Sequence, residues 1–462
     1  MPETRDAELM KQRAGQAPVL LPGQTYRSVT DQIAGIVLHR PTGLLWLALF
    51  GGAGFLFALL QYGIAYLLMR GVGIWGVNIP VAWGFAIINF VWWIGIGHAG
   101  TFISAILYLL NQTWRSSINR FAEAMTLFAV MCAGMFPLLH LGRPWLFYWL
   151  TPYPNTMTTW PNFRSPLVWD VFAVSTYFTV SLLFWYQAVV PDVATLRDEA
   201  KTYIGKAVYG ILALGWRNSA RHWRRFEMAY LLLAALATPL VLSVHTVVSF
   251  DFSVAIMPGW HESIYPPYFV SGAIFSGFAM VLLLAIPLRK FYHLEDLVTL
   301  RHLDNCGKFM IATGLLVTYT YVAETFFSWY GNDVYGAWWN WNRAHGAYRI
   351  VWYLDVLMVC VIPLVLWFGK VRRSPVLLFI VSVDIVIGMW IERVMIVVIT
   401  LNSTHLPSSY GLYIPTRWDW AVLFGTVGFF VLCFLLFVRL IPMIPIFEMR
   451  KLVHELEEEP QT

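Results

Sequence analysis

Titratable side chains interrupt the long apolar runs of this 462-residue sequence, although an ionisable group inside a membrane-like segment costs free energy. One run ends "FPLLHLGRPW", so that it stops at His140 and continues through Gly142 and Arg143. The next run opens "SPLVWDVFAV" and contains Asp170. A neutral imidazole and an ionised carboxylate are both bases near pH 7. This pair could therefore accept the two protons that a two-electron, two-proton donor releases.

Other titratable groups fall at the same predicted level. A rise of 1.5 Å per residue puts His140 roughly 28 Å above the inner start of its helix, and His245 and Asp251 near the outer end of theirs. Glu262 follows in the next outer loop, and Arg143 could keep a nearby carboxylate ionised. These residues form the candidate site, with His140 and Asp170 as its bases. The competing interpretation is that His140 only caps its helix at the headgroup level.

A second set of titratable residues lies in the other apolar runs. These candidates for a proton path are His98, Glu324, Asp355, Asp384, Glu392 and Arg393. Structural pairing competes with that function, and adjacent residues on a helix point about 100° apart. We therefore expect Arg393 to neutralise a carboxylate across the helix bundle. His98 has no evident partner at its depth, which disfavours a b-type haem and leaves a hydrogen-bonded interhelical histidine as the simpler interpretation.

The composition indicates a polytopic membrane protein. Hydrophobic residues make up 58% of the chain and charged residues only 12%. Because lipid cannot satisfy an open backbone, the fold class is all-α. Stretches of about 20 apolar residues are long enough to cross the hydrocarbon core. Ten are expected, near residues 42–68, 79–110, 121–140, 166–190, 226–249, 266–288, 308–330, 349–368, 375–400 and 419–441.

The distribution of basic residues predicts the orientation. If the N-terminus is inside, the inner segments hold 24 of the 31 Lys and Arg residues, and the outer loops hold six. Arg393 lies within a helix. Both termini are thus expected in the cytoplasm, and the net charge of +5 marks topology rather than a nucleic-acid partner. The N-terminus shows no signal-peptide pattern, so we expect it to be retained.

The four cysteines are scattered without a CxxC spacing, so this chain is not expected to hold a cysteine-ligated iron–sulfur cluster or another metal site. A faint repeat pairs "LVWDVF" with "IVWYLDV" and places Asp170 and Asp355 at similar depths. It predicts two four-helix bundles, formed by helices two to five and six to nine, with two peripheral helices. The expected divisions are residues 1–41, a cytoplasmic tail; 42–78, the first helix and an outer loop; 79–249 and 250–400, the bundles; and 401–462, the tenth helix and a cytoplasmic tail.

Two loops have unusual compositions. The inner loop "VATLRDEAKTYIGKAVYGILALGWRNSARHWRRF" mixes charged and apolar residues, which fits either an amphipathic helix at the membrane surface or a solvated connector. The outer loop between His140 and Pro166 is rich in Trp, Tyr and Pro. It fits either an interfacial cap or a docking surface.

Three stretches carry a resemblance to a known family. "GIGHAGTFISAILYLLNQTWR", "PLLHLGRPW" and "SPLVWDVFAV" resemble the NrfD/PsrC family of quinone-reactive membrane subunits. The ten helices make the chain most similar to the ActC branch, the quinol-oxidising membrane subunits of bacterial alternative complex III. The resemblance implies a bacterial inner-membrane subunit, inactive alone, with no haem or iron–sulfur cluster of its own. It implies a menaquinol or ubiquinol site near the periplasmic face, with His140 and Asp170 as the matching residues.

The resemblance also implies partners. Electrons would pass to a periplasmic iron–sulfur subunit and then to c-type haem subunits and a terminal oxidase, beside a homologous membrane subunit. Protons would be released outside, and the family is proposed to couple electron transfer to proton translocation. A related alternative is the quinone subunit of a polysulfide-reductase-like molybdoenzyme. A secondary transporter is a further alternative, but it would favour broken helices at mid-membrane, for which the sequence gives no convincing sign.

Overall fold

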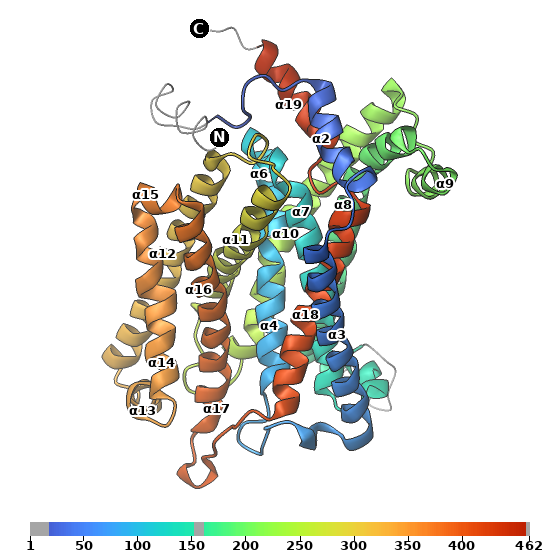
Figure 1. Ribbon diagram of the computed structural model, residues 1–462. Coiled ribbons are helices and arrows are strands. Elements are labelled where there is room, and N and C mark those ends of the chain that lie inside the picture. Colours follow the sequence, from blue (N-terminus) through green and yellow to red (C-terminus); the bar gives the residue numbers. More distant parts are fainter. Residues whose placement is uncertain (1–17, 152–160, 459–462) are drawn as a thin grey trace.

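The computed structural model describes residues 18–151 and 161–458 (Figure 1). All regular secondary structure in these residues is helical. Within these residues, ten helices are long and apolar enough to cross a membrane, which confirms the all-α polytopic prediction. Seven of these spans are continuous α-helices, and three contain a change of helical type. The spans are α3 (Leu44–Arg70), Phe85–Leu109, α7 (Asn119–His140), α8 (Pro166–Glu199), α10 (Ala220–Ser253), α11 (Tyr265–Phe291), α12 (Leu300–Tyr330), Arg349–Trp367, Pro375–Asn402 and α18 (Arg417–Leu440).

Three spans contain a π-helical turn next to a titratable residue. The span Phe85–Leu109 comprises α4 (Phe85–Ile96), α5 (His98–Thr101), the π turn η2 (Phe102–Ile106) and α6 (Leu107–Leu109). Arg349–Trp367 comprises α14 (Arg349–Asp355), the π turn η6 (Val356–Val361) and η7 (Ile362–Trp367). Pro375–Asn402 comprises α16 (Pro375–Val394), the π turn η8 (Met395–Ile399) and α17 (Thr400–Asn402). The π turns begin shortly after His98, Asp355 and Arg393, and such turns are frequent at functional sites.

The remaining helices are short and lie between or beyond the spans. They are α2 (Tyr26–Leu38), η1 (Val72–Ile74), η3 (Thr113–Ser117), η4 (Pro144–Leu150), η5 (Pro161–Arg164), α9 (Tyr203–Leu212), α13 (Val334–His345), α15 (Gly369–Arg372), η9 (Pro407–Ser409) and α19 (Ile446–Glu458). Residues 1–17 of the expected N-terminal tail and residues 152–160 of the aromatic outer loop lie outside the described residues.

Helix packing groups the spans. Helix α7 packs on α4 and α8, and α8 packs on α10, whereas α12 and α16 pack on α11. Helices α4 and α10 also contact α11, so the two groups share an interface. Helix α3 packs mainly along α18, where a β-carbon on Gly425 or Gly428 would lie within 2.5 Å of Leu60 or Leu56. These contacts support the division into two bundles and a peripheral pair, which stays a proposal.

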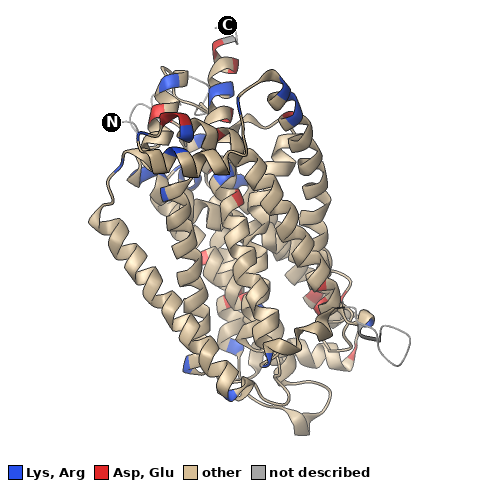
Figure 2. Ribbon diagram, turned by 90° about the vertical axis from the view of Figure 1, so that its right-hand side faces the viewer, with Lys and Arg blue, Asp and Glu red and all other residues tan. Residues whose placement is uncertain are grey.

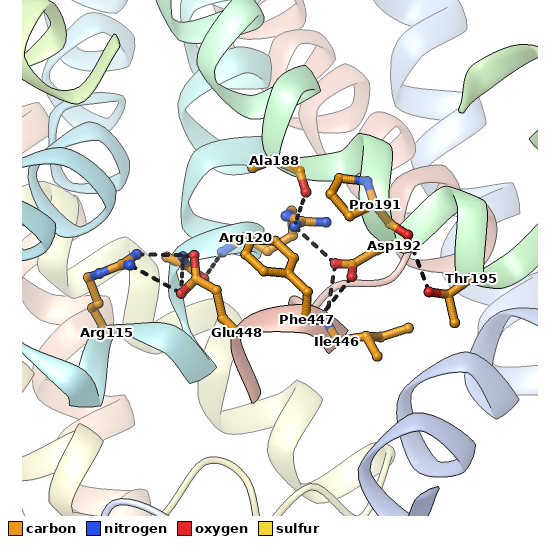
Figure 3. A network of polar contacts seen from close by, with 10 residues as sticks. Arg115, Arg120, Ala188, Pro191, Asp192, Thr195, Ile446, Phe447 and Glu448 are labelled. Carbon is orange, nitrogen blue, oxygen red and sulfur yellow. Dashed lines mark hydrogen bonds and ion pairs between the residues drawn. The ribbon is translucent and has the colours of Figure 1, made fainter. Parts of the chain in front are cut away.

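Both termini lie at the same end of the molecule (Figure 1), and Figure 2 shows most Lys and Arg residues gathered there. We call this the basic end and the other the opposite end, which includes α13 and α17. The C-terminal helix α19 is held at the basic end by buried polar contacts (Figure 3). Asp192 accepts hydrogen bonds from the backbone nitrogens of Ile446 and Phe447 at 3.0 Å, and pairs with Arg120 at 3.1 Å.

A second buried pair, Arg115–Glu448 at 3.2 Å, fixes the next part of α19. Glu448 also accepts hydrogen bonds from the Asn119 side chain at the start of α7. The tail that follows the tenth span is therefore integrated into the fold. None of these residues stands out in the sequence, because their partners lie hundreds of positions away.

Candidate functional site

His140 is positioned by a tight turn at the end of α7. Gly142 has a φ of 66°, a conformation that favours glycine, and its backbone nitrogen donates to the carbonyl of Leu139 at 3.0 Å. A β-carbon at Gly142 would lie 2.6 Å from Cγ1 of Val72. The chain therefore turns directly after His140 and continues as η4. The imidazole belongs to the last residue of α7 and does not lie inside a longer span.

Asp170 is positioned by the start of α8. Ser165 occupies the N-cap and Pro166 the first helical position, where a missing N–H costs nothing because that group has no partner within the helix. Asp170 follows one turn later and its side chain is buried, with 4% of the residue exposed. The helix start thus directs a carboxyl into the protein near the opposite end.

His140 and Asp170 line the same cavity, whose volume is about 350 Å³. The cavity lies between α4, α7 and α8, and Leu150 of η4 closes part of it. Its remaining lining is apolar except for Ser175, whose hydroxyl donates to the Val171 carbonyl. An apolar cavity of this size with a few polar groups is typical of a small-molecule site. The two bases predicted from separate spans thus face one common space.

The Asp251 carboxyl of α10 lies beside that of Asp170, and the two groups interact. Both residues are buried and their carboxyls hydrogen-bond to each other, and neither receives a hydrogen bond from any other N–H or O–H group of the described residues. Buried polar atoms normally have partners, so this pair has capacity for a ligand, a water molecule or a proton. Two adjoining carboxyls repel when both are ionised, and a proton between them removes the repulsion.

Three other predicted site residues are placed elsewhere. The side chain of Arg143 is exposed and does not line the cavity, so it is not positioned to hold Asp170 ionised. Glu262 lines a different cavity at the opposite end, of about 450 Å³, with Asp333 and His405. Partial burial raises the pKa of Glu262, and the nearby carboxylate of Glu324 raises it further. His245 is completely buried and also lies outside the cavity lining.

His245 instead contacts His98. The ring centroids are 4.4 Å apart and the planes meet at 65°. The expectation that His98 lacks a partner at its depth is therefore wrong, because the estimate from helix rise placed His245 too close to the outer surface. His98 Nδ1 bonds the carbonyl of Ile94 at 3.0 Å and the ring also interacts with the backbone of Val241, whereas neither nitrogen of His245 has a hydrogen-bond partner among the described residues. The rings touch directly, unlike axial ligands that hold a porphyrin between them.

Glu392 and Arg393 form an ion pair with each other, with Arg393 Nη2 3.3 Å from Glu392 Oε2. The expectation that Arg393 neutralises a carboxylate across the bundle is therefore wrong. Long side chains can bend toward one another even when their α-carbons point about 100° apart. The guanidinium also lies 4.5 Å from the centre of the Phe269 ring. Both charges are buried, so the pairing offsets part of their desolvation cost.

Two tyrosines connect this ion pair to Asp355. The hydroxyl of Tyr268 donates a hydrogen bond to Glu392 Oε1. The hydroxyl of Tyr321 lies 2.7 Å from Asp355 Oδ2 and 3.5 Å from Glu392 Oε1. A buried hydrogen-bonded group of five side chains thus joins α11, α12, α14 and α16. Neither tyrosine was predicted from the sequence. The signal that could have identified them is a tyrosine in a span that neighbours a span with a buried acid, because a buried tyrosine hydroxyl usually has a hydrogen-bond partner.

Glu324 pairs with Arg343, whose Nη1 lies 3.0 Å from Glu324 Oε2. Arg343 comes from α13 and is held between the rings of Trp339 and Trp352, at 3.6 and 4.3 Å from their centres. Asp384 is half-buried, and its Oδ2 atom has no hydrogen-bond partner among the described residues. Among the described residues, each member of the second set other than Asp384 has a hydrogen bond, an ion pair or a ring contact.

A family model described as "Polysulphide reductase, NrfD" matches residues 75–405, which is most of the chain. The chain belongs to the NrfD family. The match includes His98, His140, Asp170, Asp251 and the Glu392–Arg393 pair. It begins after the first span and ends before the last, so it covers the eight spans between them.

Two relatives of this NrfD protein belong to named reductases. It is 25% identical over 432 residues to a putative membrane subunit of dimethyl sulfoxide reductase from Halobacterium salinarum, covering 85% of this chain and 91% of the relative. It is 23% identical over 400 residues to a subunit of selenate reductase from Mesobacillus selenatarsenatis, covering 82% and 89%. These names favour the reductase alternative over alternative complex III, and the likeness to ActC stays a prediction.

Proposed function

We propose that this NrfD protein is the quinone-reactive membrane subunit of a multisubunit reductase, and that it oxidises quinol and passes the electrons to partner subunits. One observation carries the proposal: two bases from different spans, His140 and Asp170, line an otherwise apolar cavity within the membrane-spanning region. A quinol presents two hydroxyls on an apolar ring with an apolar tail, which matches the lining. The chemistry needs both bases, because two O–H bonds break for every two electrons that leave.

The residues of the cavity would have different roles in quinol oxidation. His140 would bind one quinol hydroxyl and take its proton on an imidazole nitrogen, while an Asp170 carboxyl oxygen would bind the other hydroxyl and take the second proton. Asp251 would then share that proton with Asp170, since the two carboxyls adjoin. The apolar wall, which includes Phe90 and Phe178, would hold the ring and exclude water. Both electrons would leave to an acceptor on a partner subunit.

The orientation determines where protons and electrons leave. The basic end is expected to face the cytoplasm, so His140 and Asp170 would lie near the outer face of a bacterial inner membrane. An iron–sulfur subunit docked at the opposite end would receive the electrons, and a molybdenum-containing catalytic subunit would use them. The names of the two relatives support a reductase of this kind. The quinol would be menaquinol or ubiquinol, and protons would be released outside.

The buried polar side chains of the second set support a further proposal, a proton path through the middle of the protein. The His98–His245 contact, the Glu392–Arg393 pair with its tyrosines, and Asp355 offer successive groups that bind protons or donate hydrogen bonds. The Phe269 ring contacts both His245 and the Arg393 guanidinium, which brings the histidines close to the ion pair. Glu324 and Arg343 would form the outer end. Asp384 lies apart from this network and would contribute only through water.

The decisive experiment combines purification with activity. The chain should be tagged in its native host, and the purified complex should contain iron–sulfur and molybdenum subunits and oxidise a quinol analogue. His140→Gln should assemble with the same subunits and lose most quinol oxidation, while reduction of the terminal substrate by an artificial electron donor is retained. His39→Gln, which changes an exposed histidine at the basic end, is the matched control. Full quinol oxidation by assembled His140→Gln would refute the proposed site, and co-purified c-type haem subunits would favour the alternative complex III assembly.

A further inference from the structure

Helix α9, in the connection between α8 and α10, exposes a set of large apolar side chains. Tyr203 is 87% exposed, and Ile204 and Ile211 are each 75% exposed. Leu214, just beyond the helix, is 71% exposed. The helix itself is well formed, because the Thr202 side chain caps its first turn through the Gly205 nitrogen at 3.1 Å. A stable helix therefore presents apolar surface outward.

The exposed residues form one face. At 100° per residue, Ile204, Val208 and Ile211 fall within a narrow stripe, and Lys206 lies on the other side of the helix. Tyr209 turns toward the protein and packs against a buried cluster that includes Val193 of α8. The helix is thus amphipathic, with one side fixed to the bundle and its most apolar stripe uncovered by any of the described residues.

Hydrogen bonds fix the level of α9 relative to the spans. The hydroxyl of Tyr209 donates to the carbonyl of Leu440, the last residue of α18, at 3.3 Å. The hydroxyl of Tyr186, within α8, donates to the carbonyl of Leu212 at 2.8 Å. Because α18 is a candidate membrane span that ends at Leu440, α9 lies level with the end of that span at the basic end, where an interface with lipid headgroups is expected. Figure 1 shows α9 projecting sideways from the bundle at that end.

The charges around α9 match a lipid surface. Between Ala200 and Ser219 the sequence contains Lys201, Lys206 and Arg217 and no acidic residue. Basic residues beside an apolar face are attracted to anionic headgroups near a charged leaflet. A protein partner is not needed to cover this face, because the interfacial position already supplies an apolar medium.

We propose that α9 is an interfacial anchor whose apolar stripe inserts into the lipid leaflet at the basic end, with its basic flanks on anionic headgroups. An interfacial helix buries its apolar face roughly 5–10 Å into the headgroup and acyl boundary. The anchor would fix the tilt of the α8–α10 pair, on which Asp170 and Asp251 are carried. The proposal is independent of the proposed function, since it concerns only the surface of the helix.

Fluorescence quenching in nanodiscs tests the contact directly. The full-length chain carrying Ile204→Cys would be labelled with a polarity-sensitive fluorophore and reconstituted with phosphatidylglycerol-containing lipid. Lys206→Cys, on the other side of the same helix, is the matched control, and unsubstituted protein reports any labelling of Cys433. Ile211→Cys provides a second reporter if the first variant folds poorly.

The expected result is a blue-shifted emission at positions 204 and 211 that is quenched by lipids carrying a spin label near the headgroup, more than by lipids labelled deep in the chain. The label at position 206 should be quenched by aqueous iodide instead. Quenching of position 204 by iodide alone would overturn the proposal. Protection of position 204 from both quenchers in the native complex, with iodide access in the isolated chain, would also overturn it, because a partner protein would then cover the stripe.

Discussion

Asp170→Asn is the substitution that most sharply separates a catalytic carboxyl from a structural one. Asparagine has nearly the same shape and still forms hydrogen bonds, but it cannot take up a proton near neutral pH. The only hydrogen bond of the Asp170 carboxyl among the described residues joins it to the Asp251 carboxyl, and the amide of asparagine can donate the same bond. The substitution also removes one of two adjoining buried carboxyls, which lowers the repulsion toward Asp251.

These facts give opposite expectations for activity and stability. Loss of a positioned general base lowers rates by roughly 100- to 10,000-fold, which corresponds to about 3–5 kcal/mol of activation free energy. A structural carboxyl would instead leave activity intact and lower stability when changed. We therefore expect Asp170→Asn to lose at least about 100-fold in quinol oxidation. Its melting temperature should be equal to or higher than that of the unsubstituted protein.

The assay compares quinol-dependent turnover of the purified complex with its thermal unfolding in the same detergent. Asp31→Asn, which changes an exposed carboxyl at the basic end, serves as the control for a general effect of lost charge. A variant that keeps turnover within about threefold would refute the assignment of Asp170, since that is far below the effect of removing a base. A variant that loses turnover only together with its fold would show a structural role instead.

Three further predictions concern the surrounding structure. Gly142→Ala should lower both stability and quinol oxidation, because the φ of 66° is strained for alanine and the new β-carbon would lie 2.6 Å from Val72 Cγ1. An unchanged melting temperature would contradict this account of the turn. Glu392→Ala should cost about 3–5 kcal/mol of unfolding free energy, because it leaves the Arg393 guanidinium buried and unpaired; chemical denaturation would show it, and a loss below about 1 kcal/mol would contradict it. Burial raises the pKa of Glu262 above 4.5, so the folded state binds a proton on this carboxyl more tightly than the unfolded state does. Stability therefore falls as the pH rises from the unfolded-state pKa to the folded-state pKa of Glu262. Glu262→Gln should abolish that part of the pH dependence of the melting temperature, and an identical pH profile would contradict it.

The spans could be predicted from sequence because each depends on local composition. A run of about 20 apolar residues must be a helix in lipid, whatever its neighbours are. The same logic found His140 and Asp170, since a titratable group beside an apolar run is conspicuous without any knowledge of packing. Local patterns also left the α9 segment open between a surface helix and a connector, and the structure shows a helix.

Lateral partners could not be predicted in the same way. His245 was assigned to the level of His140 by counting residues, but small errors in the start and tilt of a long helix accumulate to several residues at its far end. Arg393 was assigned a distant partner from α-carbon directions, although a flexible side chain decides its own contact. The tyrosines that join Glu392 to Asp355 were passed over because aromatic residues are common in apolar helices.

The sequence by itself determined that this protein is an all-helical membrane protein with ten spans, and which titratable residues lie inside them. Composition alone is enough to identify the spans, because each segment in lipid must be apolar and must satisfy its own backbone hydrogen bonds, whatever its neighbours are. Only the tertiary structure decided which of those residues meet. His140 and Asp170 share a cavity, His98 contacts His245, and Asp170 adjoins Asp251, because rotation about each helix axis and side-chain packing between helices select the partners.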